Sequence, residues 1–148
     1  TKHYEINSFH SGLLDEVDIN KLGATDYNIL YAEPGTATVN QGVMTYSFTL
    51  YVMDMINDEV GDAPNKQRLG RVDTYSETLQ ILNDVIAEFK HSLATQSWVD
   101  DQVVLQLPIT CEPFTARFNN LLTGWSATIN VDVNNKNNLC IAPIEANT

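Results

Sequence analysis

Hydrophobic and polar residues alternate most clearly in the segment from Val43 to Ile56. One face of this segment collects its apolar side chains: Met44, Tyr46, Phe48, Leu50 and Val52. Alternation with a period of two predicts a strand that is buried on one side. Because the segment is about twice as long as an average strand of 5–6 residues, we expect it to project beyond the core or to pair with several neighbours.

A second periodicity, with steps of three and four residues, predicts a long amphipathic helix. The apolar stripe consists of Tyr75, Leu79, Leu82, Ile86, Phe89 and Leu93, and it is widened by Ile81 and Val85. The predicted helix begins at Thr74, because Thr74 and Glu77 have the spacing of a capping box.

Weaker patterns predict the remaining elements. Apolar residues at helical spacing indicate a short N-terminal helix from Tyr4 to Val17. Tyr27 to Ala32 is predicted as a strand that Pro34 and Gly35 interrupt before a hairpin loop. Three further strands are predicted at residues 103–107, 109–118 and 125–133, with Pro113 at an edge, a bulge or a boundary.

This order of elements predicts an α+β fold. We expect a mainly antiparallel sheet with the long amphipathic helix packed on one face, plus the short N-terminal helix. A chain of 148 residues that is 43% hydrophobic is expected to form a single domain over residues 1–148. The strand and the following Gly- and Pro-containing loop, at about residues 43–71, are expected to project from it, and residues 134–148 to form a C-terminal segment.

The charge balance narrows the classes of partner. With 8 Lys and Arg against 19 Asp and Glu, the net charge is -11, which disfavours direct binding of duplex nucleic acid or of an anionic membrane surface. Apolar runs are far shorter than the roughly 20 residues of a spanning helix. The sequence does not start with a cationic stretch followed by an apolar block, so we expect no secretory signal.

Groups that could support catalysis are sparse in the sequence. The three histidines are scattered, and none is spaced to share a zinc ion with another ligand. An acidic group could bind a divalent cation or act in acid–base chemistry, although a solvated loop is the commoner explanation: Asp54, Asp58, Glu59 and Asp62. Cys111 is expected to be a small buried residue rather than a nucleophile. We therefore expect no enzymatic activity, no metal site and no cofactor.

Several residues are candidates for contacts between copies. Lys66, Arg68 and Arg71 form the only cationic cluster, which is either an ordinary soluble loop or a surface that meets the acidic face of a neighbouring copy. Trp125 is either a core residue or an exposed anchor of an interface. The residues that we expect at an interface are Tyr51, Met53, Lys66, Arg68, Arg71 and Trp125.

Two motifs carry a resemblance to a known group of proteins. The first is VDTYSETLQILND at residues 72–84, and the second is PFTARFNNLLTGW at residues 113–125, with Cys140 and Pro143 near the end. Together they resemble small virion proteins of tailed bacteriophages, especially those of the Bacteroidetes, including crAss-like phages. The order of long strand, loop, helix and β-hairpin is similar to that of tail-terminator and tail-completion proteins.

This resemblance implies a connector subunit that forms a ring of six or twelve copies at the head–tail junction or in the upper tail. Its neighbours would be portal, neck or tail proteins, and it would be located in the virion after assembly in the bacterial cytoplasm. An acidic channel wall would let DNA pass without specific binding. The alternatives are a capsid decoration or tail-tube-like protein, a small acidic metal-dependent hydrolase, and a monomeric regulatory binding module.

Overall fold

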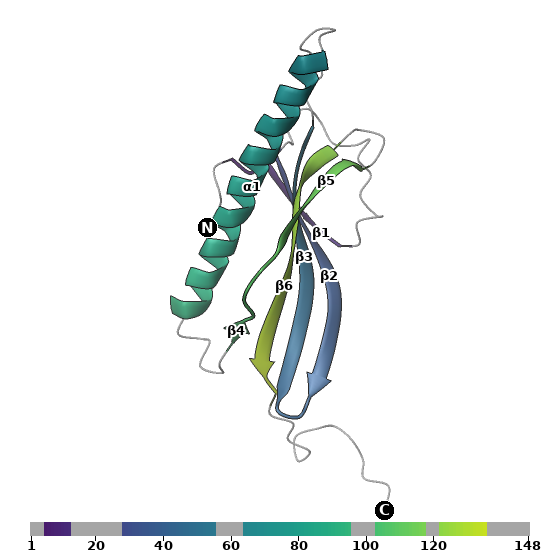
Figure 1. Ribbon diagram of the computed structural model, residues 1–148. Coiled ribbons are helices and arrows are strands. Elements are labelled where there is room, and N and C mark those ends of the chain that lie inside the picture. Colours follow the sequence, from purple (N-terminus) through teal and green to yellow (C-terminus); the bar gives the residue numbers. More distant parts are fainter. Residues whose placement is uncertain (1–4, 13–27, 56–63, 96–102, 118–121, 136–148) are drawn as a thin grey trace, which may run out of the picture.

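The computed structural model describes residues 5–12, 28–55, 64–95, 103–117 and 122–135, and shows one long helix beside a sheet (Figure 1). The elements in chain order are β1 (Ser8–Ser11), β2 (Ile29–Asn40), β3 (Val43–Met55), α1 (Pro64–Thr95), β4 (Val104–Leu105), β5 (Cys111–Arg117) and β6 (Leu122–Asn134). All the strand pairs except β1–β2 are antiparallel. The predicted α+β class, with a mostly antiparallel sheet and one long helix, is confirmed.

Strands β3 and β6 form the centre of the sheet. They pair without interruption from Val43 opposite Asn134 to Met55 opposite Leu122. β2 pairs with the other edge of β3, and β1 adds to β2 in parallel. β4 and β5 pair with separate parts of the remaining edge of β6. Among the described strands, β3 and β6 therefore have neighbours on both sides along much of their length. β2 has neighbours on both sides only at its start.

The main hydrophobic core lies between α1 and one face of the sheet. From the helix, Ile81 and Leu82 are fully buried, and the ring of Phe89 meets that of Phe48 edge to face with 5.9 Å between centroids. The sheet supplies Leu50, Val52, Ala127, Ile129 and Val131. The predicted apolar stripe of the helix and the predicted apolar faces of the two long strands thus pack against each other.

A second apolar cluster lies on the opposite face of the sheet. Its buried members are Ile29, Tyr31, Tyr51, Met53 and Leu122. The ring of Phe114 packs against this cluster and meets Tyr51 edge to face at 6.0 Å between centroids. One end of the sheet is therefore buried on both faces, whereas the alternation in β3 indicated burial on one face only.

The predicted short N-terminal helix is not seen. Residues 8–11 instead form β1, which pairs with the part of β2 from Ile29 to Ala32, while residues 13–17 lie outside the described ranges. The backbone N–H of Asn7 also donates to the carbonyl of Asn28 at 3.1 Å. The edge of β2 offers hydrogen-bond partners to the backbone, and Ile6 reaches the main core from this extended segment.

Helix α1 begins at Pro64, ten residues before the predicted start at Thr74. The predicted capping box therefore lies inside the helix, where the Thr78 hydroxyl donates to the carbonyl of Thr74 at 2.6 Å. Proline is favoured in the first turn of a helix, and the lysine, glutamine and arginine residues that follow have high helix propensity. The predicted loop is consequently wrong for residues 64–71, and residues 57–63 lie outside the described part of the chain.

Strand β2 continues through Pro34 and Gly35, where the sequence predicted an interruption. The register with β3 shifts between Pro34 and Ala37, so a bulge absorbs the irregularity and pairing resumes as far as Asn40. A tight turn containing Gly42, with a φ of 79°, then leads into β3. Pro113 lies in β5, an edge strand, as its missing N–H group requires.

Gly124 lies where the two central strands leave no room for a side chain. It lies opposite Met53, and a Cβ atom at this position would overlap with the backbone carbonyl of Val52. Rotation of a side chain cannot relieve a clash with backbone, so β3 and β6 would have to separate. Only glycine fits at this point of the pairing.

We predict that Gly124→Ala lowers the free energy of unfolding by about 3 kcal/mol, the upper end of the usual range for overpacking. Gly42→Ala is the matched control, because no atom lies within 4 Å of the added Cβ and only the positive φ opposes it. We expect that variant to lose about 1 kcal/mol. Urea unfolding measures both values, and equal losses would contradict the close approach of β3 and β6.

Candidate assembly surface

The sheet extends past the helix at one end. Figure 1 shows the turn between β2 and β3 beyond the C-terminal end of α1, together with the end of β6. We refer to residues 37–40, 43–46 and 131–134 as the hairpin end; the register aligns Ala37 with Tyr46, and Tyr46 with Val131. The expected projection of the long strand thus has a definite form, a three-stranded extension of the sheet.

Apolar side chains line one face of the hairpin end. By strand alternation and register, these residues share the face that α1 covers further along: Ala37, Val39, Met44, Tyr46 and Val133. Val39 is 60% exposed and Tyr46 is 46% exposed, whereas Val133 is half-buried and packs against the main core. Grouped apolar side chains that remain in contact with water commonly mark sites of protein association. We call these five residues the hairpin face.

The outer edge of β2 is also available for pairing. β1 covers only the part of β2 from Ile29 to Ala32, with one more backbone bond from Gly12 to Ala32. Within the described ranges, no strand pairs with the outer edge of residues 36–40. These residues, TATVN, carry no charge that would prevent another strand from adding to them.

A polar contact joins the strands on the other face of the hairpin end. The Thr45 hydroxyl donates to Asp132 Oδ1 at 2.5 Å, and the Gln106 side-chain amide donates to both carboxylate oxygens at 2.9 and 3.0 Å. These hydrogen bonds lower the pKa of Asp132 below its ordinary value, and the bond from Thr45 has the largest effect. The contact links β3, β6 and the chain after β4.

Three residues predicted at an interface lie within the fold. Tyr51 and Met53 belong to the second apolar cluster and are almost completely buried. The indole N–H of Trp125 donates to the carbonyl of Tyr75 at 2.9 Å, and the two rings meet edge to face. For Trp125 the core alternative therefore describes its position. None of the three presents a large surface to another copy.

The predicted cationic cluster belongs to the start of α1. Lys66, Arg68 and Arg71 lie in its first turns, and their side chains are outside the part that the structure describes. This end of α1 lies at the opposite end of the molecule from the β2–β3 turn (Figure 1). The cationic cluster and the hairpin end are thus separate features of one subunit.

The predicted acidic group is described only in part. Asp54 lies at the end of β3, whereas Asp58, Glu59 and Asp62 are outside the described ranges. Among the residues that the structure describes, no three His, Cys, Asp or Glu side chains are grouped to hold a metal ion. Burial raises the pKa of the Cys111 thiol, which packs against the main core. Cys111 is half-buried there, whereas a buried residue was expected.

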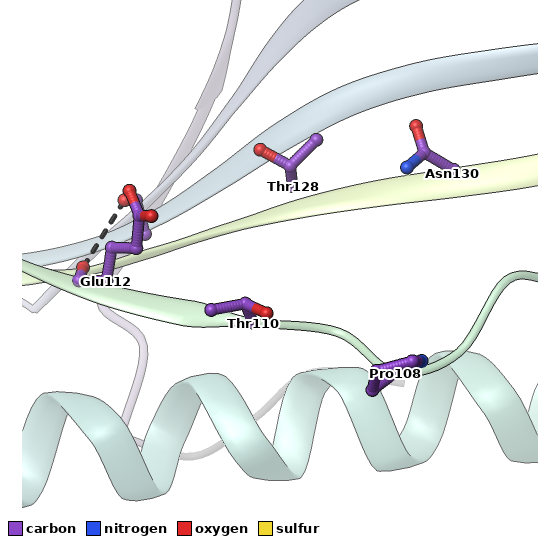
Figure 2. Close-up of a pocket in the computed structure, with 6 residues that line it drawn as sticks. Pro108, Thr110, Glu112, Thr128 and Asn130 are labelled. Atoms are coloured by element: carbon purple, nitrogen blue, oxygen red, sulfur yellow. Dashed lines mark hydrogen bonds between the residues drawn. The ribbon is translucent and has the colours of Figure 1, made fainter.

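A polar recess lies on the face of the sheet opposite α1. Its volume is about 270 Å³, and Figure 2 draws the described residues that line it: Pro108, Thr110, Glu112, Ser126, Thr128 and Asn130. The Ser126 hydroxyl donates to the backbone carbonyl of Glu112 at 3.3 Å. Among the described residues of this lining, Glu112 is the one with an ionisable side chain. The described lining residues therefore offer mainly hydrogen-bonding groups.

The interpretation of the sequence missed the hairpin face and the free edge of β2. Val39 lies just before the turn, in a segment that was predicted as loop because of Pro34 and Gly35. The available signal was the apolar residue on either side of the turn, Val39 and Val43, which are 60% and 39% exposed. Two hydrophobic residues beside a tight turn are typical of a hairpin that continues to its tip.

No protein-family model matches the chain, and no curated protein matches it at a significant level. Within the described part of the chain, no helix combines the length and apolar character that crossing a membrane requires.

We predict that Thr45→Val raises the pKa of Asp132 toward the ordinary aspartate value of about 3.9, because the hydroxyl donor is lost while the side-chain shape is kept. A carboxyl whose pKa is lower in the folded state than in the unfolded state stabilises the fold at a pH above its unfolded-state pKa. This stabilisation is lost as the pH falls through its folded-state pKa. The stability difference between the wild type and the variant should therefore vanish in acid. An NMR titration of the carboxyl measures the pKa. Thr49→Val, on the same face of β3, is the control and should leave it unchanged, and an unchanged pKa in Thr45→Val would contradict the prediction.

Proposed function

We propose that this chain is a non-enzymatic structural subunit of a tailed-phage virion, which forms a ring as a connector at the head–tail junction or in the upper tail. The observation that carries the proposal is the hairpin end, with its exposed apolar face and the free edge of β2. A surface of this kind is more typical of a subunit in a permanent assembly than of a monomer in solution.

The two edges of the sheet favour a ring over a symmetric dimer. One edge consists of β2 beyond Ala32, and the other of β4 and β5, which pair on one side only among the described strands. If the edge of β2 meets the opposite edge of the next copy, the contact joins two different surfaces. Contacts of this type close into rings when the rotation between the copies permits.

The resemblance to small phage virion proteins supports the same assignment. Its first motif, at residues 72–84, lies in the middle of α1, and its second, at residues 113–125, extends from β5 into β6. Both motifs therefore belong to elements that build the main core. They support the likeness in architecture, whereas the hairpin end supplies the surface for assembly.

The charge of the chain suits a passage for DNA. At a net charge of -11, each copy repels phosphate, so a ring of such copies would let DNA pass without binding it specifically. The same charge makes neighbouring copies repel one another, and added salt screens this repulsion. We therefore expect the ring to form more readily at high ionic strength. The hairpin end would serve equally in a tail-tube-like protein, and a capsid decoration protein stays the other structural alternative.

We predict that the purified protein forms a closed ring of six or twelve copies, and that Val39→Glu shifts it to smaller species. The reason is that a carboxylate in the centre of a contact would lose its hydration without a partner. Native mass spectrometry at two concentrations and two salt levels measures the assembly, and thermal unfolding checks that the variant folds.

Val72→Glu is the matched control for this experiment. Val72 is 55% exposed on α1, close to the 60% of Val39, and the substitution adds the same charge. We expect this variant to form the same ring as the wild type. If the wild type stays monomeric under all conditions, or if Val39→Glu assembles as well as Val72→Glu, the proposed assembly surface is wrong.

A further inference from the structure

A row of polar side chains crosses the sheet beneath α1. Asp54 pairs with Thr123 across β3 and β6, and the pairing of Ile29 with Met53 places Asn28 beside Asp54 on the other side. By alternation, all three side chains lie on the face that α1 covers. The apolar interior between helix and sheet is thus replaced at this end by an amide, a carboxylate and a hydroxyl.

Helix α1 adds a second carboxylate to this row. The side-chain amide of Asn28 donates to Glu77 Oε1 at 3.2 Å, and also to the backbone carbonyl of Glu5 at 3.3 Å. Glu77 is close enough to Asp54 for the two negative charges to repel each other. Two carboxylates therefore converge where helix and sheet meet.

Two oxygen atoms in the row have no hydrogen-bond partner among the residues that the structure describes. Thr123 is fully buried, and within the described ranges its hydroxyl Oγ1 is unpaired; the side-chain oxygen of Asn28 is buried and has no described partner either. More than nine in ten buried polar groups in folded proteins have a partner, and an unsatisfied one destabilises the fold. These two unpaired oxygens lie on either side of Asp54. Each oxygen has a lone pair that could coordinate a cation placed between it and the carboxylates.

The electrostatics of the row indicate the same need. Burial raises the pKa of Asp54, the backbone N–H of Met55 at 2.7 Å opposes this effect, and the charge of Glu77 adds to it. Lys90 is the one Lys or Arg whose side chain the structure describes. It lies 13 residues after Glu77, about 20 Å along the helix at 1.5 Å per residue. The described lysine and arginine side chains therefore leave this row without a counter-charge.

We propose that Asp54, Glu77, the Asn28 side-chain oxygen and the Thr123 hydroxyl bind a hard divalent cation, best suited to Ca²⁺, between α1 and the sheet. Carboxylate, amide and hydroxyl oxygens are the ligands of such ions, and Ca²⁺ accepts a flexible set of six to eight, completed by water. The ion would neutralise both carboxylates, satisfy both unpaired oxygens and fasten the helix to β2, β3 and β6. This inference is independent of the proposed ring.

Terbium luminescence provides a direct test, because Tb³⁺ occupies calcium sites and emits when a nearby indole transfers energy to it. Trp125 is suitably placed, since it follows Thr123 by two residues on the same face of β6 and bonds to the carbonyl of Tyr75 near Glu77. We expect Tb³⁺ emission on tryptophan excitation of the full chain, and its displacement by Ca²⁺. Trp125→Phe should reduce the emission.

The ligand variants are Asp54→Asn and Glu77→Gln, which keep the shape of each side chain. Each should weaken Tb³⁺ and Ca²⁺ binding about tenfold or more, because a charged ligand is lost. Glu88→Gln is the matched control, since Glu88 is an exposed glutamate further along α1. It should bind like the wild type. Equal emission and affinity in all these proteins would overturn the proposal, because binding would then reflect only the general acidity of the chain.

Thermal unfolding gives a second, independent result. In chelator, the two ligand variants should melt at or above the temperature of the wild type, because repulsion between the carboxylates is removed; this also shows that they fold. In Ca²⁺, the wild type should gain stability by mass action and the ligand variants should not. A Ca²⁺ effect no larger than that of NaCl at equal ionic strength, or one retained by both variants, would contradict the site.

Discussion

The pairing of β3 with β6 is the interaction on which the rest of the structure depends. It runs without interruption from Val43 opposite Asn134 to Met55 opposite Leu122, and Gly124 lets the two backbones approach at its most crowded point. The other described elements build on this pair: β2 pairs on one side, β4 and β5 on the other, α1 packs across one face, and β1 is added through β2. A slip of one residue would move Val52 and its neighbours to the opposite face and destroy both apolar clusters at once. The register is therefore fixed by packing on two sides.

The same pair of strands continues where the helix does not. Over the main core, Leu50 and Val52 are covered by α1, but at the hairpin end Val39 and Tyr46 share that face and remain exposed. The strands are held together there by backbone bonds and by the contact of Thr45 and Gln106 with Asp132. An apolar face and a strand edge that no other described residue covers are the structural basis of the proposed assembly. At the other end of the sheet, two carboxylates, those of Asp54 and Glu77, lie at the polar row beneath α1 without a counter-charge from the described lysine and arginine side chains.

Much of the fold could be predicted from periodicity alone. The apolar side chains of the helix around Leu82 and those of the strand around Leu50 each lie on one face of their element, and these two faces pack against each other. Periodicity failed where other constraints dominate. Ile6 has helical spacing to its neighbours, yet the open edge of β2 draws its segment into the sheet. Tyr51 was expected at an interface, whereas it lies in the second apolar cluster, because a one-dimensional pattern cannot show a second apolar layer within the chain. The candidate sites were harder still: Asn28, Asp54 and Thr123 belong to three distant segments, and only the strand register brings them together.

If copies of this chain associate through the hairpin end, amide hydrogen exchange should detect the association in individual segments. Exchange is measured by mass spectrometry at a low and a high protein concentration. We predict that residues 36–40 and 43–46 exchange more slowly at the high concentration, whereas residues 81–89 in the centre of α1, which pack against the sheet within each copy, do not change. Identical exchange of the hairpin end at both concentrations, or slowing confined to α1, would contradict it.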